Sequence, residues 1–166
     1  MPDHSEKKYE QTLREAGCSE KVVAHCRAVS DVALEYAQRD PFVMLDLVRK
    51  GAMLHDIGRG ASQTILHAQR GADLLRAQGI SEEVARIVEC HTGAGLTADE
   101  CTMLRLSPRD CMPRTTAEKI VTHADNLIEG RKRVIIEESI SSAIHLPRKV
   151  RRRIYHLAQE VELLCS

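Results

Sequence analysis

Aromatic side chains are almost absent from this chain of 166 residues. They make up 2% of the sequence, there is no Trp, and the only rings are those of Tyr9, Tyr36, Phe42 and Tyr155. A nucleic-acid platform built on rows of stacked rings is therefore excluded. The core must be aliphatic, and a bound nucleobase would have to rest on aliphatic walls or on arginine planes.

Net charge and long apolar runs are missing as well. Lys and Arg number 24 and Asp and Glu number 24, so no overall field attracts nucleic acid or an anionic membrane. No apolar run approaches the ~18 residues that a membrane span needs. The polar, mixed-charge residues 1–10 do not form a signal peptide. These absences predict a cytoplasmic protein that makes no membrane contact.

Paired cysteines are also lacking. No two of the six form a CxxC pair, and the gaps between them are long and irregular, so a zinc ribbon or a redox motif is excluded by spacing. We expect reduced and mostly buried thiols. The six are Cys18, Cys26, Cys90, Cys101, Cys111 and Cys165.

Apolar residues make up 43% of the chain and recur at helical spacing almost throughout. No β-type alternation is visible, so the predicted fold class is all-α. The length predicts one domain over residues 1–166, with an N-terminal helix in 1–18, a core in 19–145 and a C-terminal helix in 146–166. Helices are expected over residues 5–16, 19–39, 43–56, 62–78, 82–91, 117–129, 134–144 and 147–164. Residues 92–113 are expected to be irregular, and the N-caps are expected at Ser19, Ser62, Ser81 and Thr116.

Histidines and aspartates stand at unusual places in these helices. The pair His55 and Asp56 ends one helix just before Gly58, and His91 ends another. His25 and Asp125 lie in apolar contexts, where a lone carboxylate would be costly. His67 precedes Gly71 by one turn, and a glycine there leaves space beside the imidazole.

Imidazoles and carboxylates together suit a divalent transition metal, which is Fe, Mn, Co, Ni or Zn, rather than Ca²⁺ or an all-oxygen Mg²⁺ site. These side chains come from separate helices, so spacing alone leaves two readings open. They are either ligands of one or two ions or unrelated, individually satisfied core residues.

The ordered set His25, His55-Asp56-Ile57-Gly58, His67, His91 and Asp125 resembles the HD superfamily of metal-dependent phosphohydrolases. The segment His67-Ala68-Gln69-Arg70-Gly71-Ala72 is similar to the His-x-x-x-Gly-Ala segment of a branch with additional histidines. That branch includes the HD-GYP phosphodiesterases and the bacterial symmetrical diadenosine-tetraphosphate hydrolases. This chain lacks the Gly-Tyr-Pro signature of the first group.

The second group looks nearer. His91-Thr92-Gly93 resembles its His-Thr-Thr-Gly motif with one Thr missing, and Ala124-Asp125-Asn126-Leu127-Ile128-Glu129-Gly130-Arg131 resembles its Ala-Asp-x-Ile-Glu-Pro-x-Arg motif. The resemblance covers about residues 20–145. Residues 94–114 depart from the Met-rich segment of those hydrolases, which places the substrate in doubt.

The resemblance implies an HD-domain helical bundle with the metal site in its core. It implies that His25, His55, Asp56 and Asp125 hold one metal, and that Asp56 bridges to a second metal held by His67 and His91. It further implies hydrolysis of a phosphoester or phosphoanhydride by a metal-activated hydroxide. The substrate would be nucleotide-like: a dinucleoside polyphosphate, a nucleotide or a cyclic phosphodiester.

The predicted catalytic residues are Asp56, Arg59 and Arg131. Arg59 directly follows the His-Asp motif and Arg131 follows Asp125 by six residues, so both are candidates to bind phosphate oxygens, the alternative being solvated surface arginines. Glu129, one turn after Asp125, either faces the pocket or is exposed. His123 points away from Asp125 on a helix, and His4, His145 and His156 are expected to lie at the surface or in the core.

Two alternative functions stay open. One is a metal-bound nucleotide-sensing module without turnover. The other is an RNA-associated protein that uses the basic run Arg148-Lys149-Val150-Arg151-Arg152-Arg153, which is disfavoured because no aromatics interleave with it. A homo-oligomer is compatible with all three.

Overall fold

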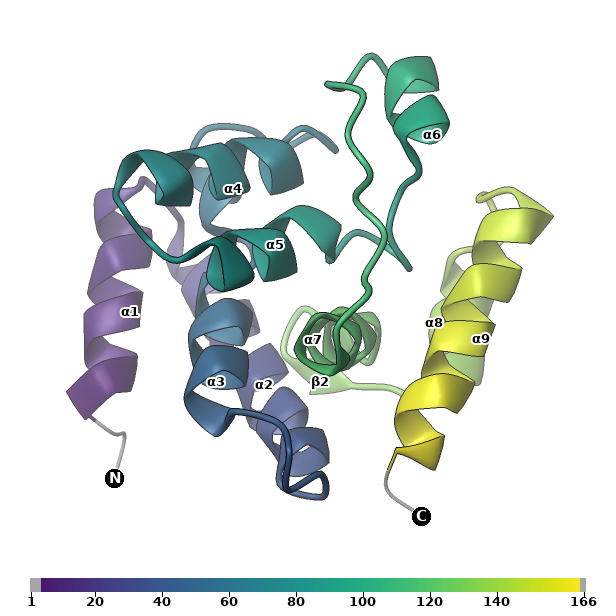
Figure 1. Cartoon of the computed structure of the whole chain (residues 1–166), viewed down its shortest axis with the longest axis horizontal. Helices are drawn as coiled ribbons and strands as arrows, with labels where there is room; N and C mark the ends of the chain where they lie inside the picture. The colour runs from purple at the N-terminus through teal and green to yellow at the C-terminus, as the bar shows by residue number, and fades with distance from the viewer. Residues whose placement is uncertain (1–3, 165–166) are drawn as a thin grey trace.

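The computed structural model describes residues 4–164, and this part of the chain is a bundle of α-helices (Figure 1). The predicted all-α class is confirmed. The helices are α1 (His4–Glu15), α2 (Glu20–Ala37), α3 (Leu45–Leu54), α4 (His67–Ala77), α5 (Glu82–Cys90), α6 (Ala98–Met103), α7 (Thr116–Asn126), α8 (Ile136–Ser142) and α9 (Arg148–Leu163). A 3₁₀ turn, η1 (Ile57–Gly60), follows α3, and the strands β1 (Ile128–Glu129) and β2 (Lys132–Arg133) follow α7.

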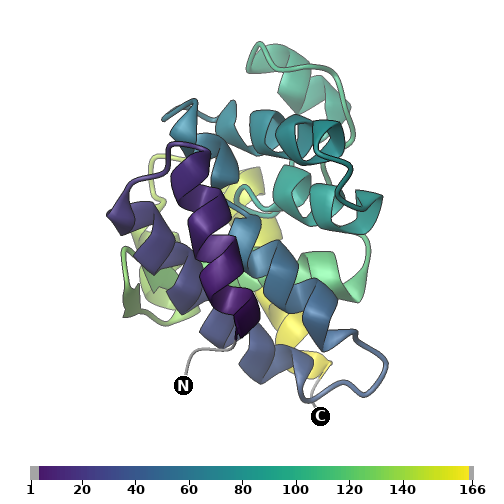
Figure 2. The same cartoon turned by 90° about the vertical axis from the view of Figure 1, so that its left-hand side faces the viewer.

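Helix α7 runs through the middle of the molecule, between the α2–α3 pair and α9 (Figure 1). Helix α1 lies on the outside of α2 and α3 (Figure 2), and α4 packs beside α5. One apolar cluster joins α2, α3, α7 and α9 around Val29, Val121 and Val161, and a second joins α1, α3, α4 and α5 around Leu13 and Leu75. Both cores are aliphatic as predicted.

The capping residues at two helix starts differ from the sequence prediction. Ser62 does not begin a helix, because its hydroxyl and that of Thr64 bond to each other at 2.9 Å and accept from nearby backbone N–H groups. Such local bonds compete with helix formation, and α4 therefore begins only at His67. Before α7, Thr115 rather than Thr116 is the N-cap, in a reciprocal capping box with Glu118.

Other N-caps follow the prediction in part. The Ser19 hydroxyl accepts from the N–H of Val22 and caps α2, whereas Ser81 stands at the N-cap of α5 without a side-chain bond. Helix α3 begins at Leu45, two residues later than predicted, after a turn in which Asp40 accepts from the N–H of Phe42 at 2.9 Å. These shifts leave the predicted order of helices unchanged.

Besides η1, a short helix and a hairpin were not predicted. The stretch expected to be irregular contains α6, which a capping box between Thr97 and Glu100 starts. The helix expected to reach residue 129 ends at Asn126, and a hairpin turning at Gly130, with φ of +65°, follows it. Strands of two residues are too short to show an alternating pattern.

The cysteine prediction is confirmed for the described part of the chain, where Cys18, Cys26, Cys90, Cys101 and Cys111 are free and buried. Cys165 lies outside the described residues. Among residues 4–164, no helix has both the length and the apolar character that crossing a membrane requires.

Candidate metal centre

Five separate segments bring the predicted ligands together. His25 comes from the middle of α2, His55 is the C-cap of α3 with Asp56 next to it, and His67 is the first residue of α4. His91 is the C-cap of α5, and Asp125 lies in the last turn of α7. Helix ends leave backbone groups without intrahelical partners, and they leave space that side chains of facing helices can occupy. The cluster therefore forms where several helix ends converge.

The close approach of η1 to α4 places His67 in the cluster. A Cβ atom on Gly58 would lie 1.9 Å from the carbonyl oxygen of His67, and one on Gly71 would lie 3.0 Å from the nitrogen of Gly58. Only glycines allow these backbones to come so near to each other. The space expected beside Gly71 is thus filled by the turn that carries Gly58.

All four histidine rings are oriented by the backbone in the same way. Each Nδ1 contacts a carbonyl oxygen: His25 that of Gly130 at 2.8 Å, His55 that of Ala52 at 2.7 Å, His67 that of Thr64 at 2.8 Å, and His91 that of Val88 at 2.6 Å. A carbonyl only accepts, so each Nδ1 carries a proton and each ring turns its Nε2 inward. Metal-binding imidazoles are held in this way in proteins.

Asp56 lies between two groups of these nitrogens. Its Oδ1 is 3.2 Å from Nε2 of His67 and 3.5 Å from Nε2 of His91. Its Oδ2 is 3.8 Å from Nε2 of His55 and 4.0 Å from Nε2 of His25. One carboxylate therefore faces both groups with different oxygens.

Asp125 completes one of the groups. Its Oδ1 is 3.0 Å from Nε2 of His25 and 3.4 Å from Nε2 of His55. Two sets of donor atoms close enough to share an ion overlap here, namely His25 with His55 and Asp125, and His55 with Asp56 and His91. The arrangement is that of a site for one or two divalent ions.

The electrostatics keep both carboxylates of the cluster in the ionised form that can bind metal. Burial raises the pKa of Asp56, but the neighbouring His55, His67 and His91 outweigh burial and hold that pKa well below its usual range. The pKa of Asp125 is lowered in the same way, by His55 and His25 against the effect of burial. Burial lowers the pKa of His91. Burial also acts to lower the pKa of His55, but Cys26, Asp56 and Asp125 outweigh burial and raise that pKa well above its usual range. Ionised carboxylates and neutral imidazoles are the forms that ligate metals, so a bound cation would displace the His55 proton.

One nitrogen of the cluster lacks a hydrogen bond within the described part of the chain. Nε2 of His55 is buried and makes no hydrogen bond among the described residues. A buried polar nitrogen without a partner is costly, and a cation inside the cluster would satisfy it. The residues present therefore fit a divalent metal of the kind that the sequence predicted.

The cluster forms the floor of a pocket of about 400 Å³. Arg59 lines this pocket, where its Nε donates to Oδ1 of Asp56 at 3.3 Å and its Nη1 donates to the carbonyl of Gln63 at 3.0 Å. Arg131 does not reach it and lines a separate depression with Glu20 and Lys21. The structure thus brings one of the two predicted phosphate-binding arginines to the cluster.

The sequence analysis missed several residues of this pocket. His145 lines it, although its position outside the motifs gave no sign of this, and so do Ser139 and Ser142 of α8. Glu129 faces the pocket, and its Oε1 accepts from the Ser142 hydroxyl at 2.9 Å. No local sequence pattern marked the missed residues as part of the pocket. They reach it because the chain turns back after β2 and continues into α8.

The remaining histidines do not join the cluster. His123 is buried beside Tyr36, with its Nε2 3.5 Å from Glu162, which agrees with the prediction that it points away from Asp125. His156 is exposed on α9. The side chain of His4 lies outside the described ones.

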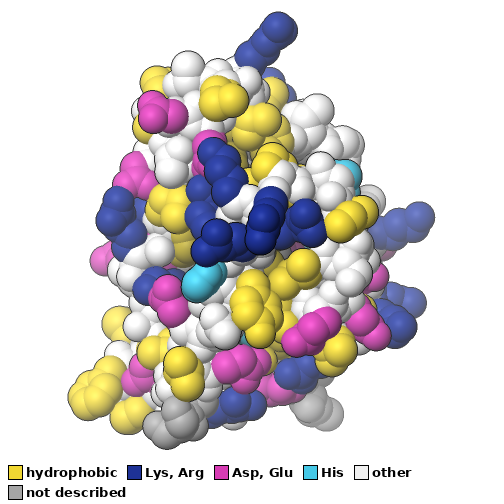
Figure 3. Space-filling model, turned by 90° about the vertical axis from the view of Figure 1, so that its right-hand side faces the viewer, with side chains coloured by type: hydrophobic (Ala, Val, Ile, Leu, Met, Phe, Trp, Pro, Cys, Tyr) yellow, Lys and Arg dark blue, Asp and Glu magenta, His cyan; other side chains and the backbone are white. Residues whose placement is uncertain are grey.

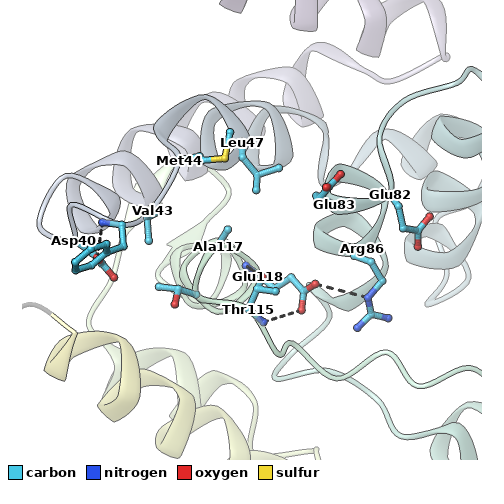
Figure 4. Close-up of a pocket in the computed structure, with 12 residues that line it drawn as sticks. Asp40, Val43, Met44, Leu47, Glu82, Glu83, Arg86, Thr115, Ala117 and Glu118 are labelled. Atoms are coloured by element: carbon cyan, nitrogen blue, oxygen red, sulfur yellow. Dashed lines mark hydrogen bonds and ion pairs between the residues drawn. The ribbon is translucent and has the colours of Figure 1, made fainter.

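Another depression, of about 450 Å³, lies between the turn after α2, α5 and the start of α7 (Figure 4). Met44 and Leu47 form its apolar side, and Arg86 faces Glu118 across it at 3.7 Å. It shares no residue with the metal pocket and contains no histidine. We assign it no chemistry.

The basic run lies on the face shown in Figure 3, where lysines and arginines gather over α9. Lys149 and Arg153 are paired with Glu100. Arg148, Arg151 and Arg152 line a depression of about 560 Å³ together with residues of α8, Tyr155 and His156.

A family comparison agrees with this geometry. The model of the HD domain family matches residues 22–129, a stretch that includes five ligand segments and ends at the hairpin. The chain belongs to the HD domain family. Its buried His and Asp cluster is consistent with the divalent metal site of HD domains.

Curated relatives of this HD-domain chain include an uncharacterized protein of Methanocaldococcus jannaschii, 50% identical over 127 residues, which are 74% of this chain and 75% of the relative. They also include the tRNA (cytidine(56)-2'-O)-methyltransferase of Thermoplasma volcanium, 41% identical over 130 residues. That match covers 78% of this chain but 38% of the methyltransferase, so most of the larger protein has no counterpart here.

Among solved structures, the HD domain of the L. monocytogenes phosphodiesterase PgpH matches with a TM-score of 0.56 and 16% identity, covering 98% of each chain. The same domain in complex with cyclic-di-AMP gives a TM-score of 0.54. These likenesses show the fold. The diadenosine-tetraphosphate hydrolase branch stays a prediction.

Proposed function

We propose that this HD-domain chain is a metal-dependent phosphohydrolase that cleaves a phosphoester or phosphoanhydride bond of a nucleotide-like substrate. The observation that carries the proposal is the position of Asp56, whose two oxygens face two groups of inward-turned imidazoles. Dinucleoside polyphosphates, nucleotides and cyclic phosphodiesters are the substrate classes proposed. The complex of the PgpH domain with cyclic-di-AMP supports a nucleotide ligand for this fold.

In this proposal His25, His55, Asp56 and Asp125 would hold one ion, and His67 and His91, together with Asp56, would hold a second. The donor set suits Fe, Mn, Co, Ni or Zn. A divalent ion supplies a Lewis acid for a phosphoryl oxygen and makes hydroxide available at neutral pH. The backbone carbonyls that bind each Nδ1 keep the four rings turned toward the ions.

The other residues of the pocket act on the substrate itself. Arg59 is held in place by Asp56 and by the Gln63 carbonyl, so its remaining N–H groups are oriented to bind phosphate oxygens. His145 and Glu129 are the pocket's titratable side chains outside the proposed ligand set. We assign His145 the transfer of a proton from its ring to the leaving oxygen. Ser139 and Ser142 of α8 also line the pocket.

The test combines elemental analysis with a hydrolysis screen on the purified full chain. Protein prepared without oxygen is tested with added Mn²⁺, Co²⁺, Ni²⁺, Fe²⁺ and Zn²⁺ against nucleotides, dinucleoside polyphosphates and cyclic dinucleotides. We expect bound metal and turnover in the wild type and neither in the double variant His55→Ala, Asp56→Ala. The variant His156→Ala, which removes an exposed histidine of α9, is the matched control and should keep both.

Each outcome of that test separates the candidates. Hydrolysis that survives in the double variant would place the reaction elsewhere. Bound metal without turnover on any substrate would favour a nucleotide-sensing module over an enzyme.

RNA association is a second candidate function, supported by the arginines over α8 and α9 and by the relative named as a tRNA methyltransferase. If it holds, RNA binding should fall steeply with salt, and replacing Arg148, Arg151 and Arg152 by Ala should reduce the slope of that dependence. RNA binding that changes neither with the salt concentration nor with these substitutions would exclude this candidate function.

A further inference from the structure

A second cavity adjoins the metal pocket. It has a volume of about 280 Å³ and shares Thr92 and Gly93 with the lining of the metal pocket. These two residues directly follow His91, one of the proposed ligands. The two spaces are therefore neighbours separated by one short turn of the chain. We name this second space the side cavity.

The walls of the side cavity are mostly aliphatic side chains from three parts of the chain. They are Ile65, Leu96, Met103, Leu104, Leu146 and Val150. Met103 and Leu104, at the end of α6, are 81% and 45% exposed, although large apolar side chains gain from burial. Exposed apolar surface beside a catalytic pocket is a common mark of a ligand site.

Lys149 and Glu100 are the charged residues that line the side cavity. Nζ of Lys149 lies 3.1 Å from Glu100, whose carboxylate also accepts from Arg153 at 2.9 Å. One carboxylate thus serves two cations, and a single net positive charge remains beside an otherwise aliphatic cavity. On the shared wall, the Thr92 hydroxyl is buried and makes no hydrogen bond among the described residues.

The wall built by α6 is fixed before any ligand arrives. Leu96 and Cys111 bond to each other in both directions, at 3.2 and 2.9 Å, and close the base of this segment. Arg153 of α9 donates to the Gly95 carbonyl at 3.0 Å and to Glu100, which ties the segment to α9. A site that needs little ordering loses little affinity to entropy.

We propose that the side cavity binds the nucleobase of the substrate whose phosphate lies at the metal centre. This inference rests on the proposed function. The two neighbouring spaces suit the two parts of a nucleotide. The metal pocket supplies cationic partners for phosphate, and the side cavity supplies a mostly aliphatic slot of a size for one ring system. Its volume lies slightly below the ~300–1,000 Å³ usual for ligand pockets, so it holds one base and not a whole dinucleotide.

The test uses two esters that differ only in the nucleoside. Thymidine 5′-(p-nitrophenyl phosphate) and methyl p-nitrophenyl phosphate share the scissile bond and the leaving group. Met103→Trp and Leu104→Trp narrow the cavity from its exposed edge, where folding is little affected. We expect each to lower kcat/KM at least ten-fold for the thymidine ester, mainly through KM, and to leave the methyl ester within two-fold.

The control is Met44→Trp, which enlarges an exposed methionine in the depression of Figure 4. That depression shares no lining residue with the side cavity. It should change neither ester. Equal losses on both esters in the cavity variants, or no loss on either, would overturn the assignment of the side cavity to the base.

A binding measurement separates this inference from the proposed function. If the wild type hydrolyses neither ester, the proposed function fails for this substrate class, and calorimetry with adenosine 5′-monophosphate and Mn²⁺ decides about the side cavity. Binding that weakens ten-fold in Met103→Trp but not in Met44→Trp would support the base site. Equal affinity in the three proteins would overturn it.

Discussion

Nε2 of His67 and Nε2 of His91 lie 3.0 Å apart. Both rings carry their proton on Nδ1, since each Nδ1 faces a backbone carbonyl. When both rings are neutral, two lone pairs therefore point at each other across the distance of a hydrogen bond. Such a contact is unfavourable between neutral rings unless a proton or a metal cation lies beside both nitrogens, and a cation turns the repulsion into two favourable bonds.

The first prediction follows from that contact. Adding Mn²⁺ at about 100 times its Kd should stabilise the fold by about 2.7 kcal/mol, which for a chain of this size is a rise in Tm of about 5–10 °C. A chelator should reverse the rise. Scanning calorimetry measures it, and His67→Ala with His91→Ala should lose most of it while His156→Ala keeps it. A Tm that none of the five metals changes would contradict a metal centre.

The second prediction concerns the glycines below the cluster. Gly58→Ala would place a Cβ atom 1.9 Å from the His67 carbonyl oxygen, so the turn η1 must move away from α4. We expect a loss of about 2–4 kcal/mol in the free energy of unfolding, measured in urea, together with weaker metal binding. Gly79→Ala is the control, since it meets no atom within 4 Å and only its φ of +73° opposes the substitution. A loss for Gly58→Ala no larger than that for Gly79→Ala would count against the steric argument.

The third prediction distinguishes the two arginines. Arg59→Ala should lower kcat/KM on a hydrolysed nucleotide by about 10²-fold, as the loss of one oriented donor to a transition-state oxygen does. Arg131→Ala tests the sequence-based expectation that this residue also binds phosphate. An unchanged kcat/KM there would remove Arg131 from the site, in line with its position beside Glu20 and Lys21.

The fourth prediction is a pH dependence of stability. Burial raises the pKa of Glu100, but the Thr97 N–H, Lys149 and Arg153 outweigh burial and lower the pKa to about 2, from 4.5. A lowered pKa in the folded state means that the carboxylate stabilises the fold above pH 4.5 and loses this effect as the pH falls toward 2. Glu100→Gln should therefore lower Tm at pH 7, and its difference from the wild type should shrink below pH 4.5. A difference that stays constant from pH 7 to pH 3 would contradict the assignment.

The sequence predicted the structure where a regular pattern, or a residue type unusual for its surroundings, pointed to one arrangement. Helical periodicity predicted the all-α class, and the costly placement of Asp125 in an apolar stretch pointed to a partner that its neighbours in sequence could not supply. The positions of His55 before Gly58 and of His91 before Gly93 predicted helix ends, which the structure confirms. Each of these signals depends on residues close together in the chain.

Other features depend on the tertiary structure and could not be predicted. His145 reaches the metal pocket only because the hairpin at Gly130 redirects the chain and α8 then crosses the opening. Arg131 stands beside a motif residue, yet the same hairpin turns it away. Residues close together in the sequence thus lie on different surfaces of the protein, and no local sequence pattern shows which surface each residue reaches.

Nε2 of His25 and Oδ1 of Asp125, which lie 3.0 Å apart, belong to residues separated by 100 positions in the sequence. The donor atoms of the cluster are therefore scattered through the unfolded chain and converge only when α2 and α7 have docked. An ion cannot stabilise such a site in a partly folded chain, so metal binding should leave the folding rate nearly unchanged and slow unfolding instead. The lifetime of the folded protein, rather than the speed at which it forms, would then depend on the supply of metal.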